Sequence, residues 1–249
     1  MAPSFDLSGK VALVTGGTRG LGYQITRALA EHGADIVVSS RKAEACEQVA
    51  AEVRALGRRA LAHPCHAGRW QEMEALAAAA YAAFGRIDIL VNNAGLAAQA
   101  PSSEETSEDL FDKTIGVNLK GPFRLSAIVG TRMVRDGGGS IINIGSAGAV
   151  RPSSPDVPIY VMAKAGLHAL TRSHAFEFGP TVRVNALIPG MFRTDMTKAW
   201  ADEADKTATN ALRRVGHAPE IAGAAVYLAS DAASYTSGAM LEVHGGFIA

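Results

Sequence analysis

Short apolar runs alternate with longer segments of helical periodicity along most of the chain. Several of the runs are rich in Val and Ile, as is typical of strands that are buried on both faces of a parallel sheet. They predict strands at residues 11–15, 35–39, 60–64, 87–92, 140–144, 182–188 and 239–243. The segments between them predict helices over residues 22–32, 43–56, 70–84, 110–135, 159–178 and 219–230. This alternation predicts an α/β fold, with a doubly wound parallel sheet of about seven strands and helices on both faces.

The organisation of the chain predicts one domain over residues 1–249, because no long linker, repeat or low-complexity tract interrupts the alternation. Two connections, at residues 147–158 and 191–217, are long for this architecture. Long ordered connections at the carboxyl ends of parallel strands often build a substrate site. A plain surface loop is the alternative for each of them.

Composition and charge exclude several classes of protein. The 249 residues are 48% hydrophobic and carry a formal net charge of zero, which predicts a folded core and argues against nucleic-acid binding. No run of about 18 apolar residues predicts a membrane helix, so no membrane partner is expected. The first nine residues lack the apolar core of a signal peptide. Cys46 and Cys65 are the only cysteines, which predicts a reducing, cytoplasmic location without a disulfide framework.

A glycine-rich turn follows the first predicted strand. The segment from Thr15 to Gly22 reads Thr-Gly-Gly-Thr-Arg-Gly-Leu-Gly and leads into a predicted helix. Glycines permit a tight turn and let the backbone approach a pyrophosphate, whose charge is stabilised at the helix N-terminus. The turn therefore predicts a dinucleotide site, and its position in the first strand-to-helix connection makes it more specific than a lone glycine motif.

Tyr160 and Lys164 are four residues apart in a predicted helix, so their side chains share one face. An ammonium group beside a phenol favours the phenolate and is expected to lower the pKa of Tyr160. The pair therefore predicts a general acid/base. Judged by the spacing alone, a chance pairing on a helix face is the favoured alternative.

Four motifs occur in one order along the chain. They are the glycine-rich turn at residues 15–22, Asn92-Asn93-Ala94-Gly95, Ser146, and Tyr160-xxx-Lys164. In this combination nearly the whole chain resembles the short-chain dehydrogenase/reductase family. The resemblance implies a single Rossmann-type domain, usually assembled as a homotetramer, that carries out NAD(P)-dependent redox chemistry on a small-molecule carbonyl or alcohol substrate.

The resemblance also implies catalytic roles. Tyr160 would exchange a proton with the substrate oxygen, and Lys164 would lower the pKa of Tyr160 and bind the nicotinamide ribose. Ser146 would hold the substrate oxygen in place, and Asn118 matches the family asparagine that holds a water in the proton relay. Taken alone, Ser146 could merely cap a strand, and Asn118 could satisfy buried backbone groups.

The cofactor contacts are expected from the glycine-rich turn, the strand ends, the catalytic helix and the segment after the sixth strand. They are Gly16, Thr18, Arg19, Gly20, Leu21, Gly22, Ser40, Arg41, His66, Asn92, Ala94, Gly95, Tyr160, Lys164, Pro189, Gly190 and Thr194. The nicotinamide amide is bound, in the family, by a segment that follows the sixth strand. Pro189, Gly190 and Thr194 resemble this segment.

The choice of cofactor follows from charge at the end of the second predicted strand. NAD-binding folds usually place an acidic residue there to hold the adenine ribose, and this chain has Ser40 followed by Arg41. Arg19, in the glycine-rich turn, can reach the same position. Two guanidinium groups favour a 2′-phosphate, which predicts NADP(H) over NAD(H). The alternative is that both arginines are solvated surface residues.

His66 stands where the family usually has an aspartate that contacts adenine. The Cys65-His66 pair resembles a subset of NADP(H)-dependent carbonyl reductases, so His66 is expected to line the adenine pocket. A metal site of His63, Cys65 and His66 is disfavoured, because strand alternation directs His66 away from the other two and no fourth ligand is evident. Four other histidines are not spaced in a pattern with residues that could act as their catalytic or metal-binding partners, so they are expected to be structural or surface residues. They are His168, His174, His217 and His244.

The expected wall of the substrate pocket is apolar, which suits a ketone, an aldehyde or a keto ester. It comes from residues 96–98 and 147–150, Met191, Phe192 and the segment through Trp200. Residues 194–197 resemble 3-oxoacyl-carrier-protein reductases, so a fatty-acid-type thioester reductase is an alternative. The basic position near residues 179–181 that docks the acidic carrier is not matched. A non-catalytic dinucleotide-sensing protein is an alternative from another class, which the presence of Tyr160 and Lys164 disfavours.

Overall fold

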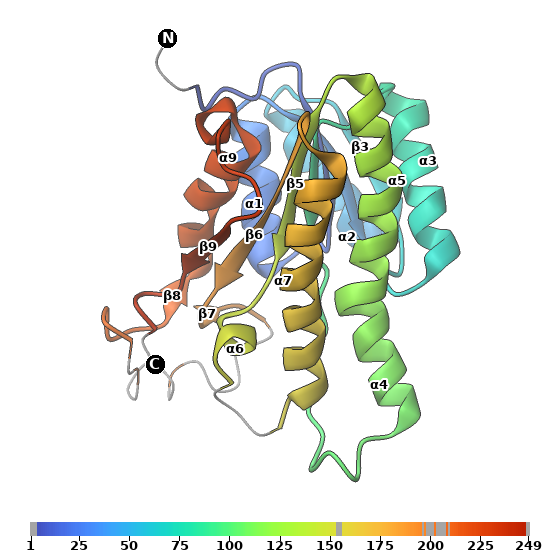
Figure 1. Ribbon diagram of the computed structural model, residues 1–249. Helices are drawn as coiled ribbons and strands as arrows, with labels where there is room; N and C mark the ends of the chain where they lie inside the picture. The colour runs from blue at the N-terminus through green and yellow to red at the C-terminus, as the bar shows by residue number, and fades with distance from the viewer. Residues whose placement is uncertain are drawn as a thin grey trace.

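The computed structural model describes residues 4–152, 156–195, 197, 202, 208 and 210–247. Its centre is a seven-stranded sheet in the order β3-β2-β1-β4-β5-β6-β9, in which all neighbouring strands pair in parallel (Figure 1). The strands are β1 (Val11–Thr15), β2 (Asp35–Ser40), β3 (Ala60–Pro64), β4 (Ile89–Asn92), β5 (Gly139–Ile144), β6 (Val182–Pro189) and β9 (Met240–Val243). The predicted doubly wound α/β fold is confirmed.

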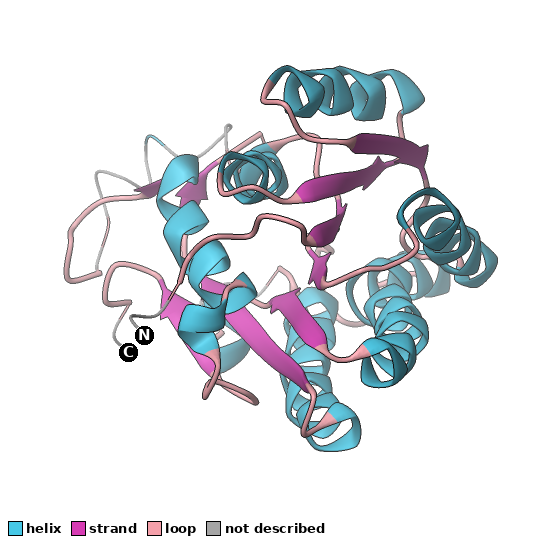
Figure 2. Cartoon of the chain, turned by 90° about the horizontal axis from the view of Figure 1, so that it is seen from above, coloured by secondary structure: helices cyan, strands magenta, loops and turns pink. Residues whose placement is uncertain are grey.

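Helices cover both faces of the sheet, as Figure 2 shows. Apolar side chains of α1 (Gly20–Glu31), α2 (Ala43–Ala55) and α9 (Ala222–Ala229) form a core with one face. Side chains of α3 (Trp70–Phe84), α5 (Gly121–Asp136) and the end of α7 (Pro158–Phe178) form a core with the other. Because both faces of the central strands are buried, β1, β2 and β4 are largely apolar, which is the pattern that the sequence shows.

One predicted helix is divided in the structure. The segment expected as a single helix over residues 110–135 comprises α4 (Glu108–Ile115), the π-helical turn η1 (Gly116–Lys120) and α5. A Cβ built on Gly121 would lie 1.8 Å from the carbonyl oxygen of Ala67, so the backbone at this break packs directly against the loop after β3. Similarly, the helix expected over residues 219–230 begins as a 3₁₀ turn, η2 (Ala218–Ile221), before α9.

The two long connections contain short elements at the carboxyl edge of the sheet. The first holds α6 (Ala147–Val150), and the second holds β7 (Phe192–Arg193), which pairs in parallel with β8 (Gly216–His217). Figure 1 shows α6, β7 and β8 gathered at the end of the sheet from which α7 starts. A further 3₁₀ turn, η3 (Asp231–Ala233), precedes β9. Within the described residues, no helix is long and apolar enough to cross a membrane.

Asp88 fixes the opposite, amino-terminal edge of the sheet. Its side chain is 6% exposed, and Oδ2 accepts a 2.9 Å hydrogen bond from the backbone N–H of Val11 at the start of β1. The Arg86 Nε also donates to Asp88 Oδ2, at 2.9 Å. The Asp88 carboxylate thus accepts a hydrogen bond from the buried Val11 N–H, and its own charge is paired with that of Arg86.

We expect Asp88→Ala to lower the free energy of unfolding by about 3 kcal/mol, because the Val11 N–H would stay buried without an acceptor. Urea unfolding of both proteins at one concentration measures the change. Glu31→Ala, which breaks the exposed Arg27–Glu31 pair on α1, is the control and should cost about 0.5 kcal/mol or less. Equal losses in the two variants would contradict the role assigned to Asp88.

Candidate active site

The predicted site residues come together at the carboxyl edge of the sheet. The glycine-rich turn follows β1, Ser40 ends β2, His66 follows β3, Asn92 ends β4 and Ser146 follows β5. The strand order places β1 between β2 and β4, so successive strands are added on one side of β1 up to β3 and on the other side from β4 onwards. Ligands of open α/β sheets bind at such a switch point.

The glycine-rich turn forms a close-packed cradle at the start of α1. Gly16 and Gly20 have positive φ angles of 65° and 54°, which favour glycine. A Cβ built on Gly22 would lie 2.2 Å from the carbonyl oxygen of Gly16, so no larger residue fits there. The residue before the helix, Arg19, makes no side-chain cap, so no side chain occupies the first backbone N–H groups of α1. This backbone suits a pyrophosphate.

Asn93, which the sequence analysis did not single out, holds the shape of this turn. Its Nδ2 donates to the carbonyl oxygens of Thr15, at 2.9 Å, and Gly16, at 3.0 Å. The Thr15 Oγ1 in turn accepts the backbone N–H of Ala94 at 3.1 Å. The signal in the sequence is the position of Asn93, directly after β4 and beside the turn that follows β1.

The Asn92 side chain points into the core. Its Nδ2 donates to Ser126 Oγ and to Asn143 Oδ1, each at 2.8 Å, and the residue is buried. Asn92 thus ties the end of β4 to α5 and β5. A cofactor contact of Asn92 remains a prediction, and it would have to come from the backbone of this residue.

The residues predicted to select a 2′-phosphate lie at the end of β2. Ser40 is half-buried, and its backbone N–H donates to Cys46 Sγ at 3.1 Å. Arg19, Arg41 and Lys42 are exposed, and none of them has an acidic partner among the described residues. Lys42 was not singled out from the sequence, although it directly follows Arg41.

The loop after β3 is fixed by Glu72. Its Oε2 accepts the backbone N–H of His66 at 2.6 Å, and Nδ1 of His66 accepts the N–H of Gly68 at 3.2 Å. Burial raises the pKa of the Cys65 thiol to about 12, and the thiol donates to the Glu72 carbonyl oxygen at 3.4 Å. In the part of the chain that the structure describes, no group of three His, Cys, Asp or Glu side chains could hold a metal ion.

Tyr160 and Lys164 lie in the first two turns of α7 and face the end of β5. The Ser146 side chain lies close enough to the Tyr160 hydroxyl to lower its pKa. Lys164 is 3% exposed, its Nζ donates to the Ile144 carbonyl oxygen at 2.6 Å, and Nζ lies 5.8 Å from the centroid of the Tyr160 ring. The structure thus brings together three of the residues that were predicted to be catalytic.

Burial dominates the ionisation of this pair. It raises the pKa of Tyr160 above its ordinary value, and the hydrogen bond from Ser146 opposes this shift only in part. Burial also lowers the pKa of Lys164 to about 8. The pKa shift of Tyr160 is opposite in direction to the one predicted from the sequence. The prediction rested on the charge of Lys164, whereas desolvation of the phenol has the larger effect.

Ser146 is bound through both its backbone and its side chain. It precedes α6, and its Oγ accepts the backbone N–H of Gly148 at 3.2 Å. Its own N–H donates to Nε2 of His168 at 3.4 Å. Ser146 thus caps the start of α6, whereas the structural alternative was the cap of a strand. Its side chain also lies close enough to the Tyr160 hydroxyl to lower the pKa of that group.

Asn118 is fully buried in the π-helical turn η1. Its Nδ2 donates to the carbonyl oxygens of Leu96, at 2.8 Å, and Thr114, at 2.9 Å, and its Oδ1 accepts the Leu96 N–H at 3.2 Å. A Cβ built on Gly95 would lie 3.3 Å from Asn118 Oδ1 and 3.8 Å from Lys164 Nζ. The amide oxygen of Asn118 and the ammonium group of Lys164 therefore both lie close to Gly95. Asn118 thus satisfies buried backbone groups, as the structural alternative for this residue had it. Its role in a proton relay stays a prediction.

The segment after β6 lies against the glycine-rich turn. A Cβ built on Gly20 would lie 3.6 Å from the Thr194 methyl group, and the Thr194 N–H donates to Thr197 Oγ1 at 2.9 Å. Of the expected pocket wall, Met191 is partly exposed, whereas Phe192 packs into the core. Trp200 and Met196 lie outside the described residues.

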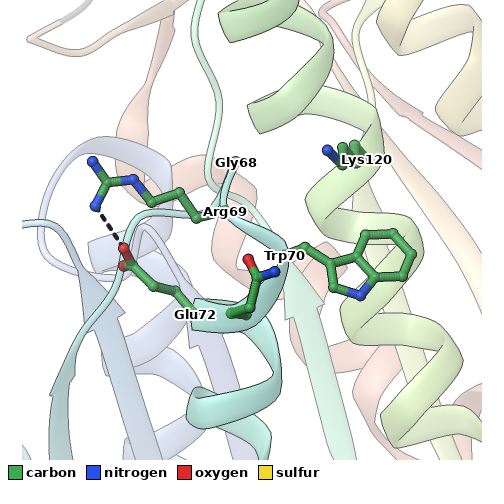
Figure 3. A pocket seen from close by; sticks show the side chains of 6 residues that line it. Gly68, Arg69, Trp70, Glu72 and Lys120 are labelled. Atoms are coloured by element: carbon green, nitrogen blue, oxygen red, sulfur yellow. Dashed lines mark hydrogen bonds and ion pairs between the residues drawn. The ribbon is translucent and has the colours of Figure 1, made fainter.

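A hollow of about 570 Å³ lies elsewhere, at the start of α3 and beside η1. Figure 3 shows Arg69 paired with Glu72 on one side and Trp70 and Lys120 on the other. Gly68 and Gln71 complete its lining. No residue predicted for catalysis or cofactor binding lines it, so it is separate from the candidate site.

Known proteins resemble this chain over most of its length. A family model described as Enoyl-(Acyl carrier protein) reductase matches residues 16–248. Human "Dehydrogenase/reductase SDR family member 4" is 38% identical over 96% of this chain and 88% of its own length. "2-dehydro-3-deoxy-D-gluconate 5-dehydrogenase" of Pseudoalteromonas atlantica is 41% identical over 100% of this chain and 99% of its own.

A solved structure agrees with these relatives. The crystal structure of a blue fluorescent protein from a metagenomic library, in complex with NADPH, superposes with a TM-score of 0.92. It is 34% identical and covers 98% of this chain and 100% of its own. Sequence and fold agree over nearly the whole length, and the chain belongs to the short-chain dehydrogenase/reductase family of oxidoreductases.

Proposed function

We propose that this protein is an NADP(H)-dependent oxidoreductase that interconverts a carbonyl compound and its alcohol, within one catalytic domain over residues 1–249. The observation that carries the proposal is the placement of Ser146 beside the Tyr160 hydroxyl, with Lys164 one turn further along α7. These groups lie at the carboxyl edge of the sheet, next to the dinucleotide cradle. Hydroxyl groups so placed can bind one substrate oxygen and exchange a proton with it.

The cradle supports NADP(H) as the cofactor. Gly22 leaves room only for backbone beside Gly16, and the exposed cations Arg19 and Arg41 suit the 2′-phosphate. A family member of the same fold was solved with NADPH. When bound, this cofactor would supply the hydride for carbonyl reduction or accept it in alcohol oxidation.

Tyr160 is proposed as the proton donor in reduction and the acceptor in oxidation. A buried phenol with a raised pKa is protonated at neutral pH, which is the form that reduction needs. The Ser146 Oγ accepts the Gly148 N–H, which fixes the serine hydroxyl where it would meet the substrate oxygen. The charge of Lys164, held at Ile144, would stabilise negative charge on the phenolate.

Asn118 is proposed to hold the relay water beside Lys164. Its amide fixes the backbone at Leu96, and its Oδ1 faces the same space beneath Gly95 as Lys164 Nζ. A water between these groups would find an acceptor in Oδ1 and a donor in Nζ. Protons that leave Tyr160 could be replaced along this path.

The test is the oxidation of NADPH by the purified protein with a panel of ketones, aldehydes, quinones and acetoacetyl thioesters. We expect turnover with apolar ketones or keto esters. Turnover with thioesters alone would favour the alternative that the acyl-carrier-protein description of the matching family model supports. Tight NADPH binding without turnover of any compound would contradict the proposal and favour a dinucleotide sensor.

We propose that the enzyme assembles as a homotetramer, as its family resemblance implies. Large apolar side chains are exposed on neighbouring helices at Phe111 of α4, Phe123 and Val134 of α5, and Phe176 of α7. Exposed apolar groups of this size commonly mark protein–protein contacts. Light scattering coupled to gel filtration gives the mass in solution, and a monomer would contradict this part of the proposal.

Arg41→Ala should weaken NADPH binding about 10- to 100-fold and leave NADH binding nearly unchanged. The variant removes a charge-assisted bond to the 2′-phosphate, worth about 1.5–3 kcal/mol. Titration of cofactor fluorescence measures both dissociation constants. Arg135→Ala, an exposed arginine near the far end of α5, is the matched control. An unchanged NADPH affinity in Arg41→Ala would refute the phosphate argument.

A further inference from the structure

His168 lies on the same face of α7 as Tyr160 and Lys164, one further turn along the helix. It is 8% exposed, and its Nε2 accepts the backbone N–H of Ser146 at 3.4 Å. Among the described residues, no other acceptor is recorded for this N–H. The sequence predicts a structural or surface histidine at this position, whereas the structure joins His168 to the predicted substrate-binding serine.

Gly145 makes this contact possible. A Cβ built on Gly145 would lie 2.2 Å from His168 Nε2 and 2.6 Å from the Ile188 Cδ1. The imidazole thus packs directly against the backbone that precedes Ser146. The Gly145 N–H donates to the Leu187 carbonyl oxygen at 2.8 Å, which fixes this backbone from the other side.

The chemical state of His168 suits an acceptor. Burial and the nearby positive charges of Lys164 and Arg172 lower the pKa of the imidazole to about 4. The ring is therefore neutral at physiological pH. Since Nε2 accepts a hydrogen bond, the proton of the neutral ring is on Nδ1.

We propose that His168 is a positioning residue that acts through Ser146: its Nε2 holds the Ser146 backbone so that Oγ meets the Tyr160 hydroxyl. Two hydrogen bonds then fix the serine beside Tyr160: His168 accepts its N–H, and its Oγ accepts the Gly148 N–H. This inference rests on the proposed function, because it assigns His168 a role in orienting the group that binds the substrate oxygen.

His168→Leu removes the acceptor with a side chain of similar size, and it leaves the Ser146 N–H without the acceptor that now binds it. We expect kcat to fall about 10- to 100-fold, because small displacements of a reacting geometry cost rate on this scale. The dissociation constant of NADPH should stay unchanged. His168→Gln keeps an acceptor near the position of Nε2, and its kcat should stay within about threefold of the wild type.

A double-mutant cycle with Ser146→Ala separates positioning from a general structural role. In the Ser146→Ala background, His168→Leu should cost less than about twofold, because no hydroxyl is left to position. Hydrogen exchange at the Ser146 amide should be faster in His168→Leu and unchanged in His168→Gln. If His168→Leu does not fold, as thermal melting would show, His168→Met replaces it in both measurements.

Wild-type kcat in His168→Leu would overturn the inference, as would an equal loss in the presence and absence of the Ser146 hydroxyl. Both results leave the proposed function intact. Wild-type kcat in Ser146→Ala is a different result, because it would overturn the role of Ser146 in the proposed function and the role of His168 with it.

Discussion

Tyr160→Phe should lower kcat by about 10³-fold or more and leave the dissociation constant of NADPH nearly unchanged. The change removes one oxygen and keeps the ring, so the buried helix face retains its packing. The lost hydroxyl is the group proposed to exchange a proton with the substrate, a contribution of about 10²- to 10⁴-fold. Steady-state kinetics with a substrate from the carbonyl panel, together with cofactor titration, measure both quantities.

The matched control is Tyr81→Phe on α3. The Tyr81 hydroxyl is buried and has no hydrogen-bond partner among the described residues, and it lies outside the candidate site. Its removal should change neither kcat nor cofactor binding. Full activity in Tyr160→Phe would remove Tyr160 from the mechanism, whereas equal losses in both variants would indicate a nonspecific effect of the substitution.

Lys164→Met should have two opposite effects. Activity should fall at least about 10²-fold, because the site loses the charge that stabilises the phenolate. Stability should rise by about 2 kcal/mol at pH 7, or about 5 °C in Tm, because the buried ammonium is costly, as its pKa of about 8 shows. The lost hydrogen bond to the Ile144 carbonyl oxygen offsets part of this gain.

The stability difference between wild type and Lys164→Met should depend on pH. The pKa of Lys164 is about 8 in the folded protein, below the ordinary value of 10.5, so the unfolded chain binds the proton more tightly. Wild-type stability therefore rises relative to the variant as pH increases from about 8 to 10.5. Melting curves at pH 7 and pH 9.5 should show the difference in Tm narrowing.

Lys113→Met is the control for this experiment. Lys113 is 61% exposed on α4 and pairs with Asp109, so its replacement should change neither activity nor Tm appreciably. A lower Tm in Lys164→Met, or a difference in Tm that widens with pH, would contradict the account of Lys164 as a desolvated cation.

The strands were predictable because burial on both sides imposes a local pattern. β1 and β3 match their predicted ranges, and β4 starts at Ile89, two residues after the predicted start. The π-helical break between α4 and α5 was not predictable. The apolar period continues through it, and the cause is a contact of Gly121 with Ala67, more than fifty residues earlier in the chain.

The candidate site shows a similar division. Helix geometry predicted that Tyr160 and Lys164 share a face. Their catalytic roles and that of Ser146 were implied by the order of four motifs that resembles the family. The pKa direction of Tyr160 could not be predicted, since desolvation depends on packing. Asn93 and His168 act on backbone groups of other segments, so their contacts could not be read from their neighbours in the sequence. The motif of residues 92–95 includes Asn93, and His168 keeps the four-residue spacing from Lys164.

Asn93 has a consequence for the thermodynamics of cofactor binding. Its amide links the glycine-rich turn to the end of β4 by bonds that belong to the chain itself. The conformational entropy of the turn is therefore lost during folding, and binding does not have to supply it again. Because of this asparagine, the entropy cost of ordering the turn is part of the free energy of folding and not of cofactor binding. The turn is therefore already rigid when the cofactor binds.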